Sequence, residues 1–261
     1  MSNLNLSVAI GDYDRNRPLI SGAVRIDGVD PVFMTLPPEE IFFRAFRSQD
    51  FDICELSLSS FTVKTAAGDC PYVGVPAFVS RAFRHTSIYV RTDRVTEPKD
   101  LKGRKVGVPE YQLTANVWAR AILEDDYGVK PSDIHWIRGG IEEAGRPEKI
   151  KVKLPAGVRR SLVERHPWLP VAVLKAFEQS KAAGLAKLSD TSATKVTLPF
   201  VEEQLAAIRA LMGDDFWSYG VEPNRKTLET FLRHHHAQGL SPRVVKVEEL
   251  FHPSTYETFK L

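Results

Sequence analysis

The feature that most constrains the fold of this chain is a change of pattern after its middle. Up to about residue 138, short apolar runs alternate with amphipathic stretches, which is the pattern of strands and helices in turn. From Arg159 onward almost every stretch has helical spacing. Strand-helix-strand units favour right-handed parallel crossovers. The sequence therefore predicts an α/β protein with parallel sheets and a helical C-terminal region.

Side-chain spacing places the expected elements. Leu6, Val8 and Ile10 share one face of a first strand, and a helix begins at Pro37, where proline and the acids that follow suit a first turn. Further strands are expected at 32–36, 51–56, 86–91, 105–109 and 134–137, and further helices at 113–127, 167–188, 199–212 and 223–238. Gly128, Gly213 and Gly239 would end three of these helices. The polar, glycine-rich stretch 139–157 predicts a loop.

The strand-helix pattern restarts after residue 92, which indicates two lobes. A chain of 261 residues is long enough for them. We expect a first lobe over 1–92, a second over 93–158, and a helical region over 159–261 that packs mainly on the first lobe. The second lobe has only two convincing strands, and a two-stranded parallel sheet is poorly stable because it cannot bury both faces. The second lobe therefore looks incomplete.

Charge and composition exclude several classes of protein. Lys and Arg number 35 and Asp and Glu 33, so a net charge of +2 predicts neither a nucleic-acid nor a membrane-surface partner. No stretch approaches the roughly 18 apolar residues of a spanning helix. The start of the chain lacks the features of an export signal, which predicts a cytoplasmic protein. Cys54 and Cys70 are expected to be free thiols there, with one disulfide as the alternative.

The strongest local feature is the turn between the strand at 105–109 and the helix after it. The first N–H groups of that helix would point beyond the carboxyl end of the strand, where they suit a carboxylate or phosphate. Gln112 and Thr114 add side-chain donors, and Glu110 and Tyr111 lie in the same turn. The alternative interpretation is an ordinary capped helix.

Three other stretches carry polar residues beside expected strands. Ser57, Ser59 and Ser60 follow the strand at 51–56, where they either bind a ligand or make a turn. The loop 11–15 holds Tyr13 and Asp14, as a site edge or as an exposed turn. Residues 81–85, with two arginines and a histidine, suit an aromatic acid or form a solvated basic loop.

A metal site is not predicted. Adjacent helix residues point about 100° apart, so His234, His235 and His236 cannot meet one ion and are expected to form a polar helix face. The chain also lacks a phosphate loop, a dinucleotide fingerprint, a GxSxG elbow and a zinc knuckle.

Several stretches resemble the 4,5-dihydroxyphthalate decarboxylases, which look like a branch of the type II periplasmic-binding-protein superfamily. The stretch DLKGRKVGVPEYQLTA is similar to solute-binding relatives in general, whereas FRHTSIYVR and FWSYGVEPNRKTLETFLRHHHAQGL are more particular to the decarboxylase branch. The other matching stretches, which run from end to end of the chain, are LPPEEIFFRAF, FDICELSLSSF, NVWARAILEDDYGV, GGIEEAGRPEK and ERHPWLPVAVLKAFEQSK.

The resemblance implies two α/β lobes around a cleft, with the chain crossing between them twice. Loops at the carboxyl ends of strands in both lobes would then line the cleft. The chain departs from its relatives at one point, because they have several tens of residues more between Val158 and Arg159. That missing part should hold the remaining strands of the second lobe, the return crossing and a strand of the first lobe.

The implied substrate is a dihydroxylated aromatic dicarboxylate, and the implied reaction converts 4,5-dihydroxyphthalate to protocatechuate and CO2. No cofactor is expected, because a ring hydroxyl supplies the electrons. Residue type and predicted position then suggest the roles. His85 is expected to donate the proton and Glu110 or Asp14 to act as the base. The residues expected to bind the substrate are Arg84 and Gln112 to Thr114, which would anchor its carboxylate, and Tyr13, Ser59 and Tyr111.

Two alternatives stay open at this point. A solute-binding protein of a transporter, or a ligand sensor, would use the same cleft without proton transfer. A shortened chain that folds poorly would do neither. The sequence also leaves open whether the protein forms a homo-oligomer.

Overall fold

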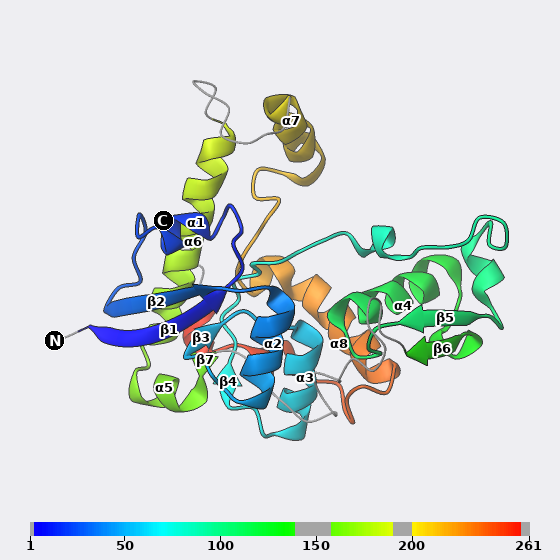
Figure 1. The fold of residues 1–261 in the computed structure, drawn as a ribbon, viewed down its shortest axis with the longest axis horizontal. Coiled ribbons are helices and arrows are strands. Elements are labelled where there is room, and N and C mark those ends of the chain that lie inside the picture. Colours follow the sequence, from blue (N-terminus) through cyan, green and yellow to red (C-terminus); the bar gives the residue numbers. More distant parts are fainter. Residues whose placement is uncertain (1–2, 139–157, 190–199, 257–261) are drawn as a thin grey trace.

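The computed structural model describes residues 3–138, 158–189 and 200–256, and Figure 1 shows two bodies joined by extended chain. The larger body contains a three-stranded sheet with helices around it. The smaller body contains a two-stranded sheet beside helix α4 (Thr114–Tyr127). The strands of both sheets are parallel, so the prediction of an α/β protein with parallel sheets is confirmed.

Strand β1 (Leu4–Ile10) lies in the middle of the larger sheet, between β2 (Val29–Thr35) and β3 (Ile53–Cys54). Helices α1 (Arg17–Ile20) and α2 (Pro38–Arg47) occupy the two connections, and α2 begins next to Pro37 as expected. Since the three strands are parallel, the residues that follow β1 and β3 leave the sheet at the same edge. This edge carries the candidate site described below.

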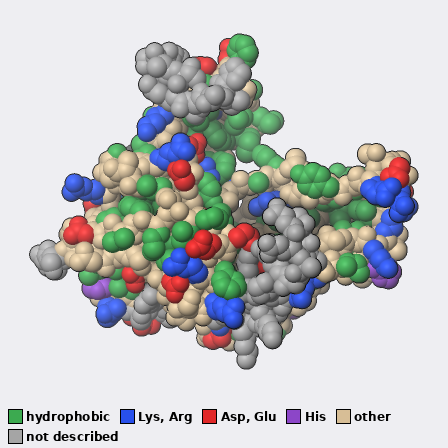
Figure 2. Space-filling model, in the orientation of Figure 1, with side chains coloured by type: hydrophobic (Ala, Val, Ile, Leu, Met, Phe, Trp, Pro, Cys, Tyr) green, Lys and Arg blue, Asp and Glu red, His purple; other side chains and the backbone are tan. Residues whose placement is uncertain are grey.

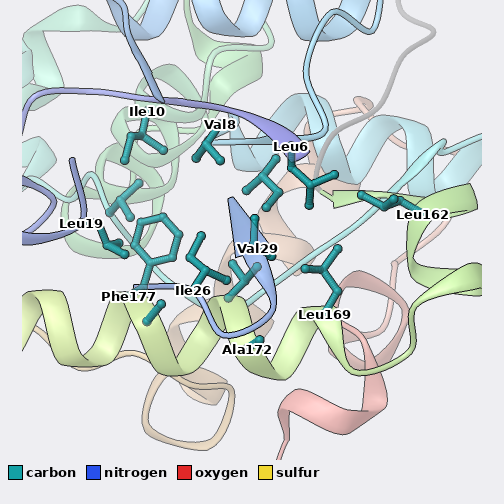
Figure 3. Packing of buried hydrophobic residues seen from close by; sticks show 14 of the residues in the cluster. Leu6, Val8, Ile10, Leu19, Ile26, Val29, Leu162, Leu169, Ala172 and Phe177 are labelled. Carbon is teal, nitrogen blue, oxygen red and sulfur yellow. The ribbon is translucent and has the colours of Figure 1, made fainter. Parts of the chain in front are cut away.

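The main core lies between β1 and helix α6 (Leu169–Leu188), as Figure 3 shows. Alternate side chains of β1 point toward α6 and are buried, which confirms the alternation seen in the sequence. The residues that Figure 3 labels are Leu6, Val8, Ile10, Leu19, Ile26, Val29, Leu162, Leu169, Ala172 and Phe177.

The smaller body is built from β5 (Lys105–Val108), α4 and β6 (His135–Arg138), with 3-10 helices at Pro98–Leu101 and Pro131–Asp133. Its small core consists of Leu101, Leu123, Val129 and Ile134. Helix α4 ends as predicted, because Gly128 takes a left-handed φ of 66° that favours glycine.

Two features join the bodies. Helix α8 (Arg225–Ala237) packs on α4 and contacts α3 (Leu58–Ala67) through His235 and Ser59, and the residues Phe61, Val117 and Phe231 lie in one buried cluster. In addition, residues 76–81 run beside residues 217–220. The Gly220 N–H donates to the carbonyl of Pro76 at 2.8 Å, and Trp217 Nε1 donates to the carbonyl of Phe78 at 3.0 Å.

The remaining elements are shorter or peripheral. They are β4 (Tyr72–Val73) paired antiparallel with β7 (Val158–Arg159), α5 (Arg160–Arg165), α7 (Val201–Met212), α9 (Val247–Leu250), and 3-10 helices at Arg84–Ser87, Glu222–Asn224 and Pro253–Thr255.

The predicted strand at 86–91 is wrong. The chain there forms the 3-10 helix Arg84–Ser87 and then an extended stretch that pairs with no described strand. The side chain of Tyr89 is 93% exposed, so the β-branched residues of this stretch have no sheet to pack on. On α7, only Leu205 of the apolar stripe is buried. The predicted loop 139–157 lies outside the described residues, and both cysteines are free as expected.

Candidate functional site

The candidate site lies where β1 and β3 end and where α3 and α4 begin. Glu55 directly follows β3, and its Oε1 accepts a hydrogen bond from the Gly11 N–H at 2.8 Å. The Tyr13 hydroxyl lies 3.3 Å from each carboxylate oxygen of Glu55. Gly11 and Tyr13 follow β1, so the parallel sheet brings an acid and a phenol together at its carboxyl edge.

Burial shifts the pKa values of both Glu55 and Tyr13. The side chain of Glu55 is almost fully covered, and burial raises its pKa to about 7, although the Gly11 N–H and the Tyr13 hydroxyl stabilise the carboxylate. Burial, with the nearby Glu55 charge, raises the pKa of Tyr13 to about 12. Tyr13 therefore keeps its proton at neutral pH, whereas Glu55 can exchange one, as a general acid or base must.

The loop that carries Tyr13 is held from two sides. A Cβ on Gly11 would lie 2.5 Å from the Tyr13 ring, so only glycine lets this ring fold back over the end of β1. Asn16 Nδ2 donates to the Gly11 carbonyl at 3.0 Å. On the other side, α6 approaches so closely that a Cβ on Gly184 would lie 3.0 Å from the loop backbone. The position of Tyr13 is therefore determined by packing on both sides of the loop.

The starts of α3 and α4 meet through hydroxyl groups. The hydroxyls of Ser57 and Thr114 lie 3.0 Å apart, and the Ser59 N–H donates to Thr114 Oγ1 at 3.0 Å. Within the described residues, the backbone N–H groups of Thr114 and Ala115 make no hydrogen bond. Such free donors at a helix start favour an anion, as the sequence suggested for this position.

His235 supports this junction from α8. Its Nε2 lies 3.0 Å from Ser59 Oγ and its Nδ1 lies 3.1 Å from Ser241 Oγ. Burial lowers the pKa of His235 to about 4, so the ring is neutral at pH 7. The expected polar face is therefore wrong for His234 and His235, which are buried where α8 packs on α4 and contacts Ser59 of α3.

The turn before α4 uses its own polar side chains. Gln112 Nε2 donates to Glu110 Oε2 at 2.9 Å, and both residues are buried. The Arg120 guanidinium lies 3.7 Å from the centroid of the Tyr111 ring and donates to the Tyr111 carbonyl at 2.7 Å. Glu110, Tyr111 and Gln112 therefore lie at the predicted place beside Thr114, with contacts that maintain the turn itself.

Arg84 and His85 lie elsewhere. His85 Nε2 is 3.3 Å from Asp126 Oδ2, in the last turn of α4. Along a helix axis, that is roughly 18 Å from Thr114. The expectation that these two residues meet the start of α4 is therefore wrong, because the linking chain runs on to the far end of this helix. Asp14 does lie on the Tyr13 loop, but it is exposed and pairs with Arg15 at 2.9 Å.

A pocket of about 210 Å³ lies beside His85. Apolar side chains from the linking chain and α4 make up most of its wall, and Thr96 and Glu97 are the other polar residues that line it. A dicarboxylate needs cationic or N–H donors, and this wall provides only His85. The pocket at the far end of α4 therefore does not suit such a ligand. Its lining residues are His85, Ile88, Val90, Val95, Thr96, Glu97, Pro98, Leu101, Ile122, Leu123 and Tyr127.

Sequence reasoning missed Glu55 and His235 as site residues. The signal for Glu55 was its place directly after the buried strand, at the edge where Ser57 and Ser59 had been noted. The signal for His235 was helical spacing, because it follows Leu228 and Phe231 on the buried face of α8. Both signals depend on knowing which faces the neighbouring elements cover.

Two kinds of feature are absent from the described residues, a metal site and a membrane-spanning helix. No three His, Cys, Asp or Glu side chains gather there in a way that could hold a metal ion. None of the helices described is long and apolar enough to cross a bilayer.

Comparison with known proteins identifies relatives of the whole chain. No family model matches it. The 4,5-dihydroxyphthalate decarboxylase of Comamonas testosteroni is 51% identical over an alignment of 330 positions that covers 100% of both chains. A protein of the same name from Pseudomonas putida is 65% identical over 168 residues, 64% of each chain.

The alignment with the Comamonas protein has more positions than this chain has residues, 330 against 261, so it opens gaps opposite residues of the relative. Such gaps agree with the extra residues that the resemblance implied. At 51% identity over both complete chains, the chain belongs to the 4,5-dihydroxyphthalate decarboxylase family.

Proposed function

We propose that this protein is a carboxy-lyase that converts 4,5-dihydroxyphthalate to protocatechuate and CO2. The observation that carries the proposal is the 51% identity, over the whole chain, with an enzyme of that name. The candidate site supports it, because a buried acid with a pKa of about 7 lies two residues from a cluster of hydroxyl groups at two helix starts. Such groups suit a small aromatic dicarboxylate with ring hydroxyls.

The chemistry sets the requirements. Direct loss of CO2 from the ring would leave an aryl carbanion, so the ring carbon that bears the leaving carboxylate is protonated first. A hydroxyl para to that carbon supplies electrons when its own proton is removed. The protein must therefore supply a base for the hydroxyl, a route by which a proton reaches the ring carbon, anchors for the substrate and a dry pocket for the departing carboxylate.

Glu55 is the base in this proposal. Its carboxylate takes the proton from the ring hydroxyl as the ring carbon takes a proton from solvent. When CO2 leaves, the electrons of the broken bond restore the aromatic ring and Glu55 returns its proton to the ring oxygen, so the reaction consumes one solvent proton in total. The hydrogen bonds from the Gly11 N–H and the Tyr13 hydroxyl stabilise the carboxylate that this step needs. Glu55 takes the role that the sequence suggested for Glu110 or Asp14, because Glu110 holds a buried turn and Asp14 is exposed.

The hydroxyl cluster orients the substrate. Ser57, Ser59 and Thr114 present hydroxyl groups that can donate to or accept from ring hydroxyls. The first N–H groups of α4 add donors for an acidic group. Tyr13 stays protonated and fixes the position of Glu55. Arg84 and His85 have no role in this proposal, since they lie at the other end of α4.

A type II periplasmic-binding-protein-like architecture, with two lobes around a cleft, is part of the same proposal. The paired segments 76–81 and 217–220 support it, because two crossings side by side would let two lobes hinge about one line. The hydroxyl groups of Ser57 and Thr114 lie between the two bodies, at the start of α3 in one body and of α4 in the other. In the space-filling view of Figure 2, acidic and basic side chains lie near the middle of the face of the molecule that is seen.

The experiment is to incubate the purified full chain with 4,5-dihydroxyphthalate and follow the formation of protocatechuate. We expect product from the dihydroxylated substrate and none from phthalate, which lacks the hydroxyl that supplies electrons. Binding of 4,5-dihydroxyphthalate without product would contradict the enzyme and favour a solute-binding or sensor role. Absence of both binding and product would contradict each of these functions.

A further inference from the structure

Tyr219 carries a buried hydroxyl that has no hydrogen-bond partner in the described part of the chain. The residue is only 1% exposed, so water does not satisfy this hydroxyl. A buried polar group without a partner lowers stability, and native proteins contain few of them. Tyr219 lies on segment 217–220, one of the two segments that link the bodies.

Arg81 lies on the other linking segment and is partly buried. Its Nη1 donates to the Ser218 carbonyl at 3.0 Å and its Nη2 donates to Asn224 Oδ1 at 3.0 Å. Among the described residues, no carboxylate lies within ion-pair distance of this guanidinium. Burial lowers the pKa of Arg81, and the opposing effect of the Asp215 charge does not cancel this shift.

Arg15 lies between two aromatic rings. Its guanidinium carbon is 4.6 Å from the Tyr13 ring centroid and 4.3 Å from the Trp217 ring centroid. Nε donates to the Val79 carbonyl at 2.7 Å, and Nη1 pairs with Asp14. Nη2 makes no hydrogen bond within the described residues, so this nitrogen can still donate to an anion.

These three groups gather around residues 217–219. Arg15 stacks on Trp217, and Arg81 donates to the carbonyl of Ser218. Both cations act on Tyr219, because burial and the charges of Glu178 and Asp14 raise the pKa of its phenol and the charges of Arg15 and Arg81 oppose that rise. Arg15 also stacks on Tyr13, which contacts Glu55, so the group is continuous with the candidate site.

Lys181 does not belong to this group of donors. Its Nζ lies 4.5 Å from the Tyr219 ring centroid, but it pairs with Glu178 at 2.8 Å and Asp215 at 3.3 Å. Two acids therefore pair with Lys181, whereas among the described residues Arg81 forms no ion pair and feels Asp215 only from a greater distance.

The proposed substrate poses a problem that this arrangement solves. 4,5-Dihydroxyphthalate is symmetric, so its two carboxylates are chemically equivalent and only the site can decide which one leaves. We propose that Arg15, Arg81 and the Tyr219 hydroxyl form the subsite for the carboxylate that the substrate keeps. This inference rests on the proposed function.

The physical reason is the loss of charge on decarboxylation. Two guanidinium groups attract a carboxylate strongly but have little attraction for neutral CO2, so a carboxylate held there is stabilised against departure. The other carboxylate, which is not held by these cations, is the one that leaves. Arg15 and Arg81 are partly exposed, so the substrate can reach them. The Tyr219 hydroxyl is buried, so it must be uncovered as the substrate binds to act as a third donor.

The test compares Arg81→Gln and Tyr219→Phe with the matched control Arg91→Gln, which changes an arginine that is 68% exposed. The readouts are KM for 4,5-dihydroxyphthalate and the affinities for protocatechuate and catechol by calorimetry. Protocatechuate has the retained carboxylate, whereas catechol has none. We expect Arg81→Gln to weaken protocatechuate binding and raise KM by roughly ten- to a hundredfold, and Tyr219→Phe by about two- to tenfold. Catechol binding and the control should not change.

Tyr219→Phe keeps the proposal testable if Arg81→Gln misfolds. It removes only a hydroxyl that has no partner, so its midpoint of thermal unfolding should stay equal or rise while its affinity for protocatechuate falls. A merely structural tyrosine would not separate these two readouts. Wild-type affinity for protocatechuate in both variants would overturn the subsite, even if the wild type turns over. A wild type that binds protocatechuate through Arg81 but forms no product would contradict the proposed function and leave the carboxylate subsite supported.

Discussion

The two ends of helix α4 carry the same kinds of side chain in different surroundings. At its start, Thr114 contacts Ser57 and Ser59 of the larger body, and His235 of α8 contacts Ser59. At its end, Asp126 meets His85, and both side chains are more than half exposed. A hydroxyl network that is buried between three helices therefore contrasts with an exposed pair beside an apolar pocket.

The comparison shows that a candidate site is recognised by burial and contacts rather than by residue type alone. The motif with Arg84 and His85 looked suitable because of its residue types, but the side chain of His85 is 55% exposed and contacts the exposed Asp126 at the end of α4. Glu55 was less conspicuous in the sequence, yet burial shifts its pKa into the range where proton exchange is useful. Partners from distant segments, rather than residue type, distinguish the start of α4 from its end.

The largest expected effect is that of Glu55→Gln. If Glu55 is the base, this substitution lowers kcat by about 10²- to 10⁴-fold, because the amide cannot accept the hydroxyl proton. In the wild type, kcat/KM should rise with pH and level off above a pKa of about 7. Steady-state kinetics on 4,5-dihydroxyphthalate measure both. Asp126→Asn is the matched control at the other end of α4, and equal losses in the two variants would remove the distinction.

The next effect is on stability at low pH. The folded-state pKa of His235 is about 4, below its ordinary value of 6.5, so the unfolded chain binds more protons between these two values. The free energy of unfolding therefore falls as pH drops through this window, by roughly 2–3 kcal/mol from this residue. Urea unfolding at pH 7 and pH 5 measures it, and comparison with His235→Phe isolates it from the acids. His85→Gln should keep the wild-type slope; a flattened slope there would contradict the assignment.

Thr114→Val should have a smaller effect on stability. Valine keeps the shape but leaves the Ser59 N–H and the Ser57 hydroxyl without their partner, which lowers the free energy of unfolding by about 1–3 kcal/mol. Thr86→Val is the control near His85, where the lost hydrogen bond to Phe83 is exposed and water replaces it. Urea unfolding of both variants compares them. A larger loss for Thr86→Val would be inconsistent with the buried network.

The smallest expected effect is that of His85→Gln on turnover. The sequence suggested that this change would abolish product formation while binding remained. Since His85 lies roughly 18 Å along α4 from Thr114, we now expect kcat and KM within about twofold of the wild type. Loss of turnover with normal binding of protocatechuate would return His85 to the mechanism and contradict the site described above.

Much of the fold followed from local pattern. The alternation of Leu6, Val8 and Ile10, the proline and acids that begin α2, and the glycine that ends α4 all act over a few residues, and each predicted its element correctly. The run at 86–91 misled because β-branched residues favour a strand only where a neighbouring strand pairs with them. Nothing within six residues indicates whether that neighbour exists.

For the candidate site too, local pattern predicted some positions, whereas others depended on tertiary packing. Loop 11–15 and the serines after β3 could be placed at one edge, since parallel strands end on the same side. The approach of Ser59 to Thr114 and the burial of His235 needed the packing of α3, α4 and α8. The distance of His85 from the start of α4 needed the path of the linking chain.

Read alone, the residues of this chain determined an α/β protein with parallel strands, polar groups after them and a likeness to decarboxylases, because strand alternation, helix starts and family motifs are written in neighbouring positions. Only the tertiary structure shows which of these polar groups are buried and which are exposed to solvent. That choice depends on contacts between residues such as Glu55 and Gly11, or Arg15 and Trp217, that are far apart in the sequence. The free energy of a charge depends on how much water surrounds it, and only the folded chain excludes that water.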